Sequence, residues 1–290
     1  MKPPPFRYHD PETLADAIGL LGRLDNARLL AGGQSLMPML NMRYVLPDHV
    51  IDLNRVGEMT YLREADGALE IGAMTRQRDI EFSGLVRTRC PLMHEAILQV
   101  GHRQTRNRGT LGGSLCQLDP AAELVAVAMA LDATVSVTGP KGSRTLPFAE
   151  FPAGYMTPAL ASDEMLTGAR FPLWKKGHGH AFVEFARRHG DFAVVSAAAL
   201  LEEDTSGRVT RASIAIGGTG PAPVRMKEAE QMLVGNVASA ALFSEASESC
   251  RKLDTTGDVH APAAYRRHLA VVLSRRALER AHDRIGRAGP

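Results

Sequence analysis

Two short segments combine paired glycines with polar side chains, the residue types that bind phosphate groups. The first segment is Ala31-Gly32-Gly33-Gln34-Ser35 and the second is Thr110-Leu111-Gly112-Gly113-Ser114. Because glycine has no Cβ, its backbone N–H can approach an anion closely, and a hydroxyl adds a further donor. Two such loops suit the two phosphates of a dinucleotide, although glycine pairs are also common in plain turns. Neither segment is a Walker A motif or a GxGxxG motif.

The other residues that could bind a metal or take part in catalysis do not form recognisable sets. The three cysteines, Cys90, Cys116 and Cys250, are far apart and make no CxxC pair, so we interpret them as small buried side chains rather than zinc or iron–sulfur ligands. His178 and His180 make a lone HxH without a partner motif. We find no combination of nucleophile, base and oxyanion donor. The sequence therefore predicts neither a metal site nor catalytic side chains.

Composition and charge narrow the class of protein. The chain has 290 residues, of which 44% are hydrophobic and 23% charged, as is typical of a globular protein. Thirty-four Lys and Arg against 32 Asp and Glu leave a net charge of +2, too little to drive nucleic-acid binding by counterion release. No apolar stretch reaches the roughly 18 to 20 residues that span a bilayer, and no signal peptide is recognisable. We therefore expect a cytoplasmic protein that binds no nucleic acid and has no membrane span.

The elements around the two segments follow from hydrophobic periodicity and turn signals. A strand at 27–31 leads into the first segment, and a short helix at 36–42 follows it. Asp10 is expected to cap a helix with Pro11 in its first turn, and Asp66-Gly67 predicts a hairpin turn. Further elements are expected as a strand at 50–53, helices at 76–82 (capped by Thr75), 90–100 and 121–131, and a hairpin at 134–146. Residues 101–120, which hold the second segment, are expected to be mostly loop.

The last third of the chain follows a charged, glycine-rich stretch at 174–179. Strands are expected at 181–185, 194–202 and 209–216, and helices at 224–233, 237–250 and 263–281. Because strands and helices do not alternate regularly along the chain, the pattern favours an α+β fold over a doubly wound parallel sheet.

The context of the second segment is more specific than its glycines. Residues 101–124 read GHRQTRNRGTLGGSLCQLDPAAEL. This stretch resembles the FAD-binding medium subunit of the molybdenum hydroxylases, the family of carbon monoxide dehydrogenase and xanthine dehydrogenase. Members carry AGG[HQ]S early in the chain and then RNxGTxGGSL followed by DPAA[DE]. The resemblance continues through IGAMT at 71–75, FPAGYMTPALASDEML at 151–166, RRHGDFA at 187–193 and GGTGPAPVR at 217–225.

The resemblance implies a fold and a division into domains. The expected fold is α+β: a FAD-binding domain of the PCMH or vanillyl-alcohol-oxidase type at 1–177, made of two α+β subdomains at about 1–55 and 56–177. A C-terminal α+β domain of the carbon monoxide dehydrogenase flavoprotein type is expected to follow at 178–290.

The resemblance also implies a site. It places residues 31–35 and 110–114 on the two loops that bind the pyrophosphate of FAD. Glu123 falls where the family has an acidic residue, usually Asp, near the ribose or adenosine, and Leu166 falls in the segment that packs against the flavin region. Phe192 stands where relatives carry Tyr or Phe close to the isoalloxazine ring. The alternative for Phe192 is a core aromatic. We interpret His189 and Asp191 as residues that shape its loop.

By resemblance, the chain passes electrons rather than contacting the organic substrate. Its FAD would receive them one at a time from a small subunit with two iron–sulfur clusters, which draws them from the molybdenum cofactor of a large subunit, and an external acceptor would take them. The expected assembly is a dimer of heterotrimers. Two alternatives remain open: a stand-alone FAD-dependent oxidase or reductase of the same fold, and a nucleotide-binding adaptor without turnover.

Overall fold

The N-terminal subdomain is built on a small parallel sheet with the strand order β1-β3-β2. The structure is a computed structural model and describes residues 1–286. The elements of this subdomain are β1 (Arg7–His9), α1 (Leu14–Leu21), β2 (Ala27–Leu30), α2 (Leu36–Asn41), β3 (His49–Asp52) and the 3₁₀ helix η1 (Gly57–Met59). Ala17 and Leu21 of α1 are buried in one core with Ile51 of β3.

Helix α1 begins later than predicted, and Asp10 does not cap it. Its N-cap is Thr13, whose hydroxyl accepts a hydrogen bond from the Asp16 amide at 3.1 Å. The Asp10 carboxylate instead pairs with Arg55 at 3.1 Å. The prediction was wrong because the Asp10 side chain forms an ion pair with an arginine 45 residues later in the chain. A threonine three residues after Asp10 serves as the cap instead.

The second subdomain contains a five-stranded antiparallel sheet with the strand order β4-β5-β10-β6-β7. Its strands are β4 (Leu62–Ala65), β5 (Ala68–Gly72), β6 (Thr134–Gly139), β7 (Gly142–Pro147) and β10 (Met165–Pro172). A 3₁₀ helix, η2 (Phe148–Glu150), and a two-stranded ladder of β8 (Pro152–Gly154) and β9 (Thr157–Pro158) lie between β7 and β10. The hairpin at Asp66-Gly67 is confirmed, with φ of +46° and +70° at the two turn residues.

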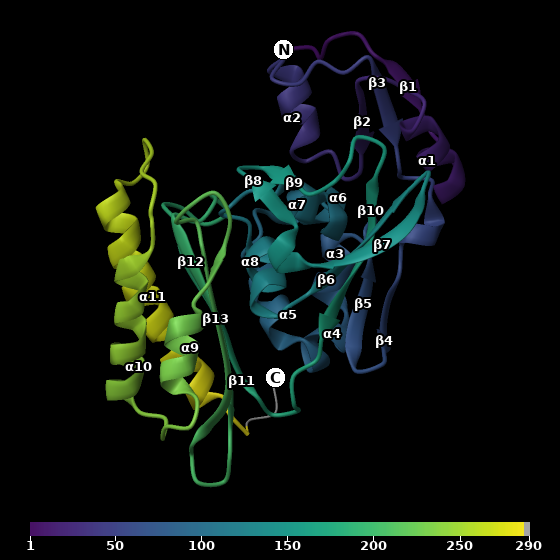
Figure 1. Ribbon diagram of the computed structural model, residues 1–290. Coiled ribbons are helices and arrows are strands. Elements are labelled where there is room, and N and C mark those ends of the chain that lie inside the picture. Colours follow the sequence, from purple (N-terminus) through teal and green to yellow (C-terminus); the bar gives the residue numbers. More distant parts are fainter. Residues whose placement is uncertain (287–290) are drawn as a thin grey trace.

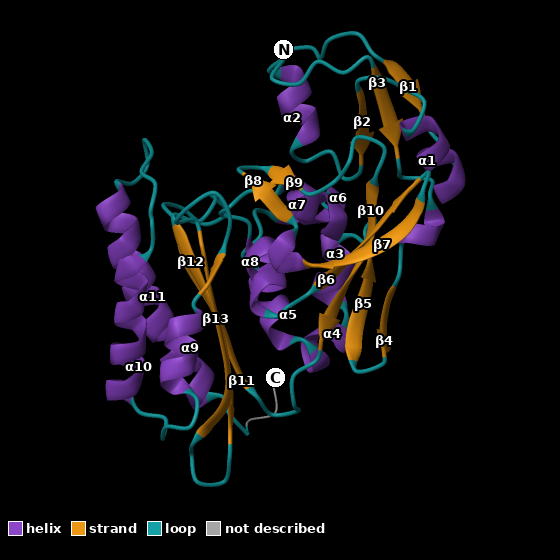
Figure 2. Ribbon diagram, in the orientation of Figure 1, coloured by secondary structure: helices purple, strands orange, loops and turns teal. Residues whose placement is uncertain are grey.

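Six helices lie beside this sheet (Figure 2). They are α3 (Gln77–Phe82), α4 (Gly84–Arg89), α5 (Pro91–Ile97), α6 (Arg103–Arg108), α7 (Leu111–Gln117) and α8 (Glu123–Ala130). The expectation that 101–120 is mostly loop is wrong, because α6 and α7 occupy most of it. Helix α7 contains Gly112 and Gly113, which are poor helix formers, yet Leu111 and Leu115 are fully buried and hold it in place. Packing therefore overrides propensity here.

Helix α3 also departs from its predicted start. Its N-cap is Arg76 rather than Thr75. The Thr75 hydroxyl donates to the carbonyl of Tyr61 at 2.8 Å and accepts from the amide of Tyr61 at 3.2 Å. Because this hydroxyl is used to join the end of β5 to the segment before β4, it is not available as a cap.

The C-terminal domain is a four-stranded antiparallel sheet, β11-β12-β13-β14, with three helices. Its elements are β11 (Gly179–Phe185), β12 (Val195–Glu203), β13 (Val209–Gly217), β14 (Val224–Arg225), α9 (Lys227–Leu233), α10 (Ala240–Glu248), the 3₁₀ helix η3 (Ser249–Lys252) and α11 (Ala263–Asp283). The helix expected from 224 begins at Lys227, since Val224 and Arg225 pair with β13. The helix expected from 237 begins after Ser239, whose hydroxyl accepts from the Leu242 amide at 3.2 Å.

Helices and sheets alternate in layers across the molecule (Figures 1 and 2). Helix α11 packs on one face of the β11–β14 sheet and α8 on the other, so that α8 lies between this sheet and the five-stranded one. Residues 195–201 of β12 are all buried. With both faces covered, this strand reads as a continuous apolar run rather than an alternation. Within residues 1–286, no helix is long and apolar enough to cross a membrane.

Candidate functional site

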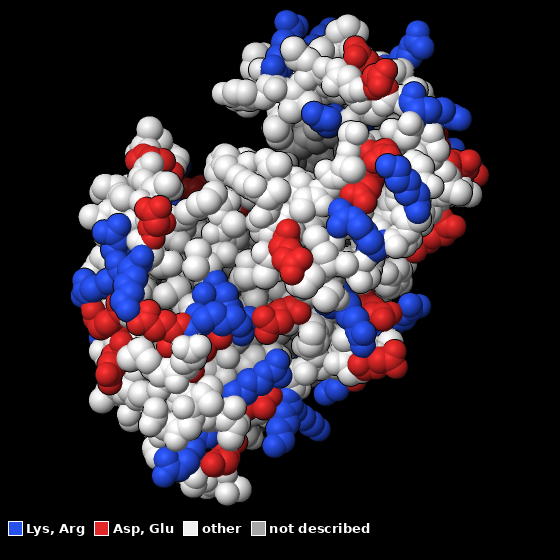
Figure 3. All heavy atoms as spheres, in the orientation of Figure 1, with Lys and Arg blue, Asp and Glu red and all other residues white. Residues whose placement is uncertain are grey.

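A cleft with a cavity of about 540 Å³ lies where the N-terminal subdomain meets the second subdomain. The molecule is visibly hollowed between the N-terminal subdomain and the C-terminal domain, with charges of both signs spread over this face (Figure 3). The sequence-predicted residues that line the cleft are Ala31, Gly32, Gly33, Gln34, Ser35, Thr110, Gly112, Gly113, Ser114, Glu123, Leu166 and Phe192. Leu111 does not line it, because its side chain is fully buried in the core beneath α7.

The first glycine loop presents backbone donors. Among the residues that the structure describes, the amides of residues 32–35 donate to no protein acceptor. The chain turns at Gly33, whose φ of +76° lies in the region that favours glycine. Helix α2 follows directly, so the partial positive charge at the N-terminus of this short helix lies beside the same amides. This loop suits an anion.

The second glycine loop has its backbone donors occupied. The Leu111 amide donates to the Thr75 carbonyl at 3.0 Å and the Gly112 amide to the Ala73 carbonyl at 2.8 Å. The Gly113 amide donates to the Thr110 hydroxyl at 3.1 Å, and the amide of residue 114 donates to the carbonyl of residue 110 at 3.2 Å. The expectation that glycines leave amides accessible is therefore wrong for this loop.

Side-chain hydroxyls are what the second loop offers instead. Thr110 Oγ1 accepts from Gly113, which leaves its own O–H group to donate. Ser114 Oγ accepts a hydrogen bond from Gln77 Nε2 at 2.8 Å, so the O–H group of Ser114 is likewise left to donate. The Oε1 atom of Gln77 is buried without a partner, and this side chain lines the cleft. The second loop thus pairs two hydroxyl donors with an unsatisfied amide oxygen.

The first loop packs against residues 108–109, which lead directly into the second loop. A Cβ on Gly32 would lie 2.2 Å from the carbonyl oxygen of Arg108 and 2.8 Å from Cα of Gly109. Only glycine fits between these backbone atoms. The first loop therefore needs Gly32 in order to reach the second, and the two sets of donors face one cleft.

Arg76 and Asn54 bridge the loops, and sequence reasoning missed both. Arg76 donates to the Arg108 carbonyl and, at 2.5 Å, to Asn54 Oδ1. Asn54 Nδ2 in turn donates to the Ala31 carbonyl at 3.2 Å. Burial lowers the pKa of Arg76, with the nearby Arg108 charge adding to the effect, but an arginine stays charged at any physiological pH. The contacts span 22 or more positions of sequence, so no local pattern could reveal them.

Glu123 begins α8 and is 5% exposed. Its pKa is raised to about 8, mainly by burial, and the charges of Glu184 and Asp119 act in the same direction, whereas a backbone hydrogen bond and the charge of Arg106 oppose the shift. Burial also raises the pKa of Asp119 and brings that of Glu184 to about 7. Glu123 therefore keeps its proton at neutral pH and can donate a hydrogen bond to a ligand oxygen.

Leu166 and Phe192 reach the cleft from two different domains. Leu166 lies in β10 next to an irregularity in its pairing with β6, and such a bulge changes the direction in which side chains point. Phe192 lies on the loop between β11 and β12 and is 66% exposed. It lines this cleft and also a neighbouring cavity of about 510 Å³. The alternative that Phe192 is a core aromatic is therefore wrong.

The loop that carries Phe192 is supported by residues other than Phe192. Gly190 has a φ of +86° and lies against the ring of His102, where a Cβ would be 2.3 Å from Cε1. The Asp191 amide donates to the Arg188 carbonyl at 3.1 Å. The rings of His189 and His102 have centroids 6.1 Å apart. These contacts agree with the interpretation of His189 and Asp191 as residues that shape the loop.

The donor set fits a dinucleotide better than a metal. Free amides, hydroxyls and a protonated carboxyl suit phosphate and ribose oxygens, and the cavity volume lies in the range of ligand sites. Over residues 1–286, no group of three or more His, Cys, Asp or Glu residues could hold a metal ion. The three cysteines are free, and burial raises the pKa of the Cys90 thiol to about 12.

Comparison with known proteins defines the class. Residues 4–174 match the FAD-binding domain in molybdopterin dehydrogenase, and residues 180–281 match the CO dehydrogenase flavoprotein C-terminal domain. Together with the cleft, these matches define a FAD-binding flavoprotein of mixed α and β structure. The chain belongs to the family of FAD-binding medium subunits of molybdenum hydroxylases, and FAD is its cofactor.

Relatives match this chain from end to end. Caffeine dehydrogenase subunit beta of Pseudomonas sp. (strain CBB1) is 40% identical, and the match covers 98% of this chain and 97% of that protein. The 6-hydroxypseudooxynicotine dehydrogenase complex subunit alpha of Paenarthrobacter nicotinovorans is 36% identical with the same coverage. A solved carbon monoxide dehydrogenase from Hydrogenophaga pseudoflava superimposes with a TM-score of 0.95 at 34% identity, covering 99% and 100% of the two chains. These relatives are dehydrogenases, and this chain is likewise an oxidoreductase subunit.

Proposed function

We propose that the chain transfers electrons within a molybdenum hydroxylase complex. Its FAD would be reduced by iron–sulfur clusters on a small subunit, and these clusters would receive their electrons from the molybdenum cofactor of a large subunit. An external acceptor would then reoxidise the FAD. The observation that carries the proposal is the end-to-end match to chains that are themselves subunits of dehydrogenases. FAD supplies a ring that takes up and releases electrons.

The residues of this chain bind and orient the dinucleotide in the proposal. The pyrophosphate would lie against residues 32–35, which offer amides, and residues 110–114, which offer hydroxyls. The protonated carboxyl of Glu123 would donate to a sugar oxygen, because burial holds the pKa of this carboxyl near 8. Leu166 and Phe192 would enclose the ring. Phe192 is exposed at the point where the two cavities meet, so it would also limit access to the ring.

The assembly and location belong to the same proposal. We expect a dimer of heterotrimers with the molybdenum-binding large subunit and the small subunit with two iron–sulfur clusters. The predicted cytoplasmic location stays a prediction. The buried face of α11 is not available to partners, because Leu269, Leu273 and Leu278 are in the core of its own domain.

Reconstitution of the complex tests the proposed function. The isolated, FAD-loaded chain should show flavin absorbance and no hydroxylation of purine, N-heteroaromatic, aldehyde or carbon monoxide donors. With both partner subunits present, flavin bleaching should follow addition of the complex's substrate, and omission of the iron–sulfur subunit should abolish it. Turnover of an organic donor by the isolated chain, free of molybdenum and iron, would instead establish a stand-alone flavin enzyme.

A further inference from the structure

A short irregular segment at 159–164, between β9 and β10, forms one edge of the cleft. We call it the lip segment. Leu160, Ala161, Ser162 and Glu164 all line the cavity. The segment contains no helix or strand, so its position depends on contacts with other parts of the chain.

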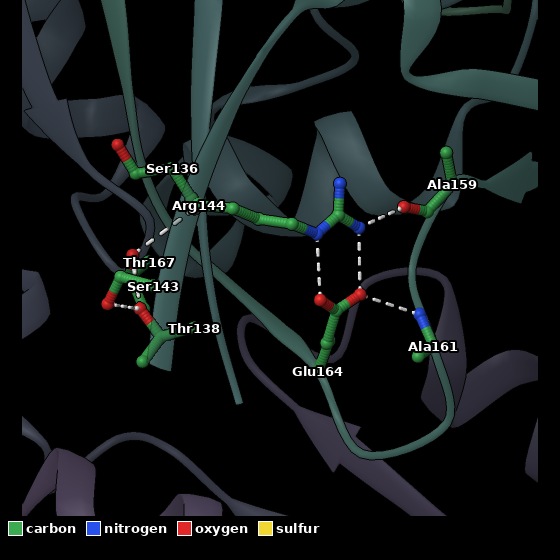
Figure 4. A network of polar contacts seen from close by, with 8 residues as sticks. All are labelled: Ser136, Thr138, Ser143, Arg144, Ala159, Ala161, Glu164 and Thr167. Carbon is green, nitrogen blue, oxygen red and sulfur yellow. Dashed lines mark hydrogen bonds and ion pairs between the residues drawn. The ribbon is translucent and has the colours of Figure 1, made fainter. Parts of the chain in front are cut away.

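Arg144 makes those contacts from β7, the edge strand of the five-stranded sheet (Figure 4). Its Nε donates to Glu164 Oε1 and its Nη2 to Glu164 Oε2, both at 2.8 Å. The same Nη2 donates to the Ala159 carbonyl at 2.8 Å, and the amide of Ala161 donates to Glu164 Oε2 at 2.8 Å. One guanidinium thus holds both ends of the lip segment through a bidentate pair, the geometry in which arginine binds a carboxylate most strongly.

The hairpin that carries Arg144 is a firm support. Thr138 Oγ1 lies 3.1 Å from Ser143 Oγ across the hairpin, and Thr167 donates to the Ser136 carbonyl at 3.2 Å. At its tip, a Cβ on Gly139 would be 3.0 Å from the carbonyl oxygen of Asp163. The end of the hairpin therefore packs directly under the lip segment.

The pair also controls charge at the cleft. Hydrogen bonding to Arg144, and secondly to the Ala161 amide, lowers the pKa of Glu164 to about 2. Glu164 is therefore ionised at neutral pH, on the edge of a cavity that takes a ligand with two phosphates. Without Arg144, an uncompensated carboxylate would face an anionic cofactor, and repulsion would weaken binding.

We propose that Arg144 is a positioning residue for FAD, which fixes the lip segment through Glu164 and cancels the charge of this carboxylate beside the bound dinucleotide. The proposal depends on FAD binding in this cleft and is independent of the electron acceptor and of the partner subunits. It can therefore fail while the proposed electron transfer holds.

A matched control pair exists elsewhere in the chain. Arg89 of α4 donates to Glu64 of β4 in the same bidentate manner, at 2.8 and 2.7 Å. The side chains of this pair are 33% and 35% exposed, against 44% for Arg144 and 19% for Glu164. Neither Arg89 nor Glu64 lines the cleft. Removal of this pair measures what a surface ion pair of this kind contributes without any role at the site.

The test compares R144Q, E164Q, the double variant R144Q/E164Q and R89Q in the full FAD-loaded chain. The FAD release rate is followed by flavin fluorescence after dilution, and the Tm of each variant is measured alongside. R144Q should release FAD about fivefold faster than the unaltered chain, and E164Q and the double variant about twofold faster. High salt should bring R144Q close to E164Q, since it screens the exposed carboxylate. R89Q should leave the release rate unchanged.

Two results would overturn the proposal. If R144Q lowers the Tm as R89Q does and leaves FAD release unchanged, the pair is only a surface contact. If the double variant releases FAD as fast as R144Q, an uncompensated charge on Glu164 is not the cause, and the charge argument is wrong.

Discussion

The two glycine loops look alike in sequence and behave differently in the structure. Both combine a glycine pair with a hydroxyl residue. In the first, the amides of 32–35 have no acceptor within residues 1–286. In the second, the amides of 111–114 are all used by the protein. A glycine pair therefore does not by itself predict an anion-binding backbone, because the neighbouring strand and cap decide whether its amides remain available.

The cause of the difference is where each glycine lies. Gly112 packs against β5's end, with Ala73 so close that a Cβ would be 2.6 Å from the alanine Cβ. Its role is to let α7 approach the sheet. Gly32 lies against residues 108–109, which lead into the second loop, and its Cβ would be 2.2 Å from the Arg108 carbonyl oxygen by the same measure. One glycine joins a helix to a sheet, and the other joins two loops to make a site.

The largest effect is expected for Gly32→Ala. The added Cβ must push the first loop away from the Arg108 carbonyl, so the amide donors and the hydroxyl donors would no longer face one ligand. We expect the FAD Kd to rise about a hundredfold, which equals about 3 kcal/mol, as measured by titration calorimetry. Gly19→Ala is the control, because a Cβ at this helical position meets nothing within 4 Å. Unchanged FAD affinity in Gly32→Ala would show that the contact between the loops is dispensable.

Gly112→Ala should instead act on the fold. Overpacking against Ala73 is expected to lower the free energy of unfolding by about 2.5 kcal/mol, whether or not FAD is present. Gly113→Ala is the companion variant, since its Cβ would crowd the movable Thr110 hydroxyl at 2.8 Å and meet the Ala31 Cβ at an ordinary contact distance of 3.8 Å. It should weaken FAD binding with a smaller loss of Tm. Equal Tm losses in the two variants would contradict the distinction between these glycines.

Glu123→Gln tests whether burial beyond the second loop keeps the Glu123 carboxyl protonated. Burial raises the pKa of Glu123 from its usual value near 4.5 to about 8 in the folded chain. Between these pH values the folded state holds a proton that the unfolded state has lost, so stability falls as pH rises through this window. The variant should lack this part of the slope and gain stability relative to the unaltered chain as the pH rises towards 8.

Thermal unfolding at pH 5, 7 and 9 measures this slope. Glu64→Gln is the control, because Arg89 lowers the pKa of Glu64 and its contribution is lost only as the pH falls through that lowered pKa. It should leave the slope from pH 5 to 8 unchanged. Parallel curves for the Glu123→Gln variant and the unaltered chain would mean that Glu123 is ionised like an exposed carboxylate.

The smallest effect is expected for Thr110→Val. The valine loses the hydroxyl that accepts from the Gly113 amide, and loss of such an N-cap costs about 1 kcal/mol. It also removes one of the two hydroxyl donors of the second loop. Thr110→Ser keeps both roles and should restore Tm and FAD affinity in the same measurements. Weak FAD binding by Thr110→Ser together with normal binding by Thr110→Val would instead place the role of Thr110 in its methyl group.

The sequence could predict the parts of the molecule that depend on local patterns. The Asp66-Gly67 hairpin follows from turn chemistry, and the amphipathic C-terminal helix from its periodicity, with Leu273 buried against its own domain. The residues of both glycine loops were predictable as a pair because the family resemblance adds their context. The structure then brings the two loops into contact.

What could not be predicted depends on contacts between distant residues. Helix α6 is a polar run in which the buried Arg106 pairs with Glu81, with 2.9 Å between Nε and Oε2. Hydrophobic periodicity does not predict such a pair. The bridge of Arg76 and Asn54 and the pair of Arg144 and Glu164 join segments 20 or more positions apart. Which donors of the second loop remain available also depends on tertiary structure, because the Gly112 amide donates its hydrogen bond to the Ala73 carbonyl.

The strand β12 has a consequence for how the chain denatures. Ala198 and Leu200 belong to the core that contains α8, whereas Ala197 and Ala199 belong to the core that contains α11. A division of the chain at residue 178 stays a prediction, but a fragment that ends there would expose the apolar side of α8 to water and tend to aggregate. The two family regions are therefore expected to melt in a single cooperative transition, and a stabilising substitution in either should protect both from proteolysis.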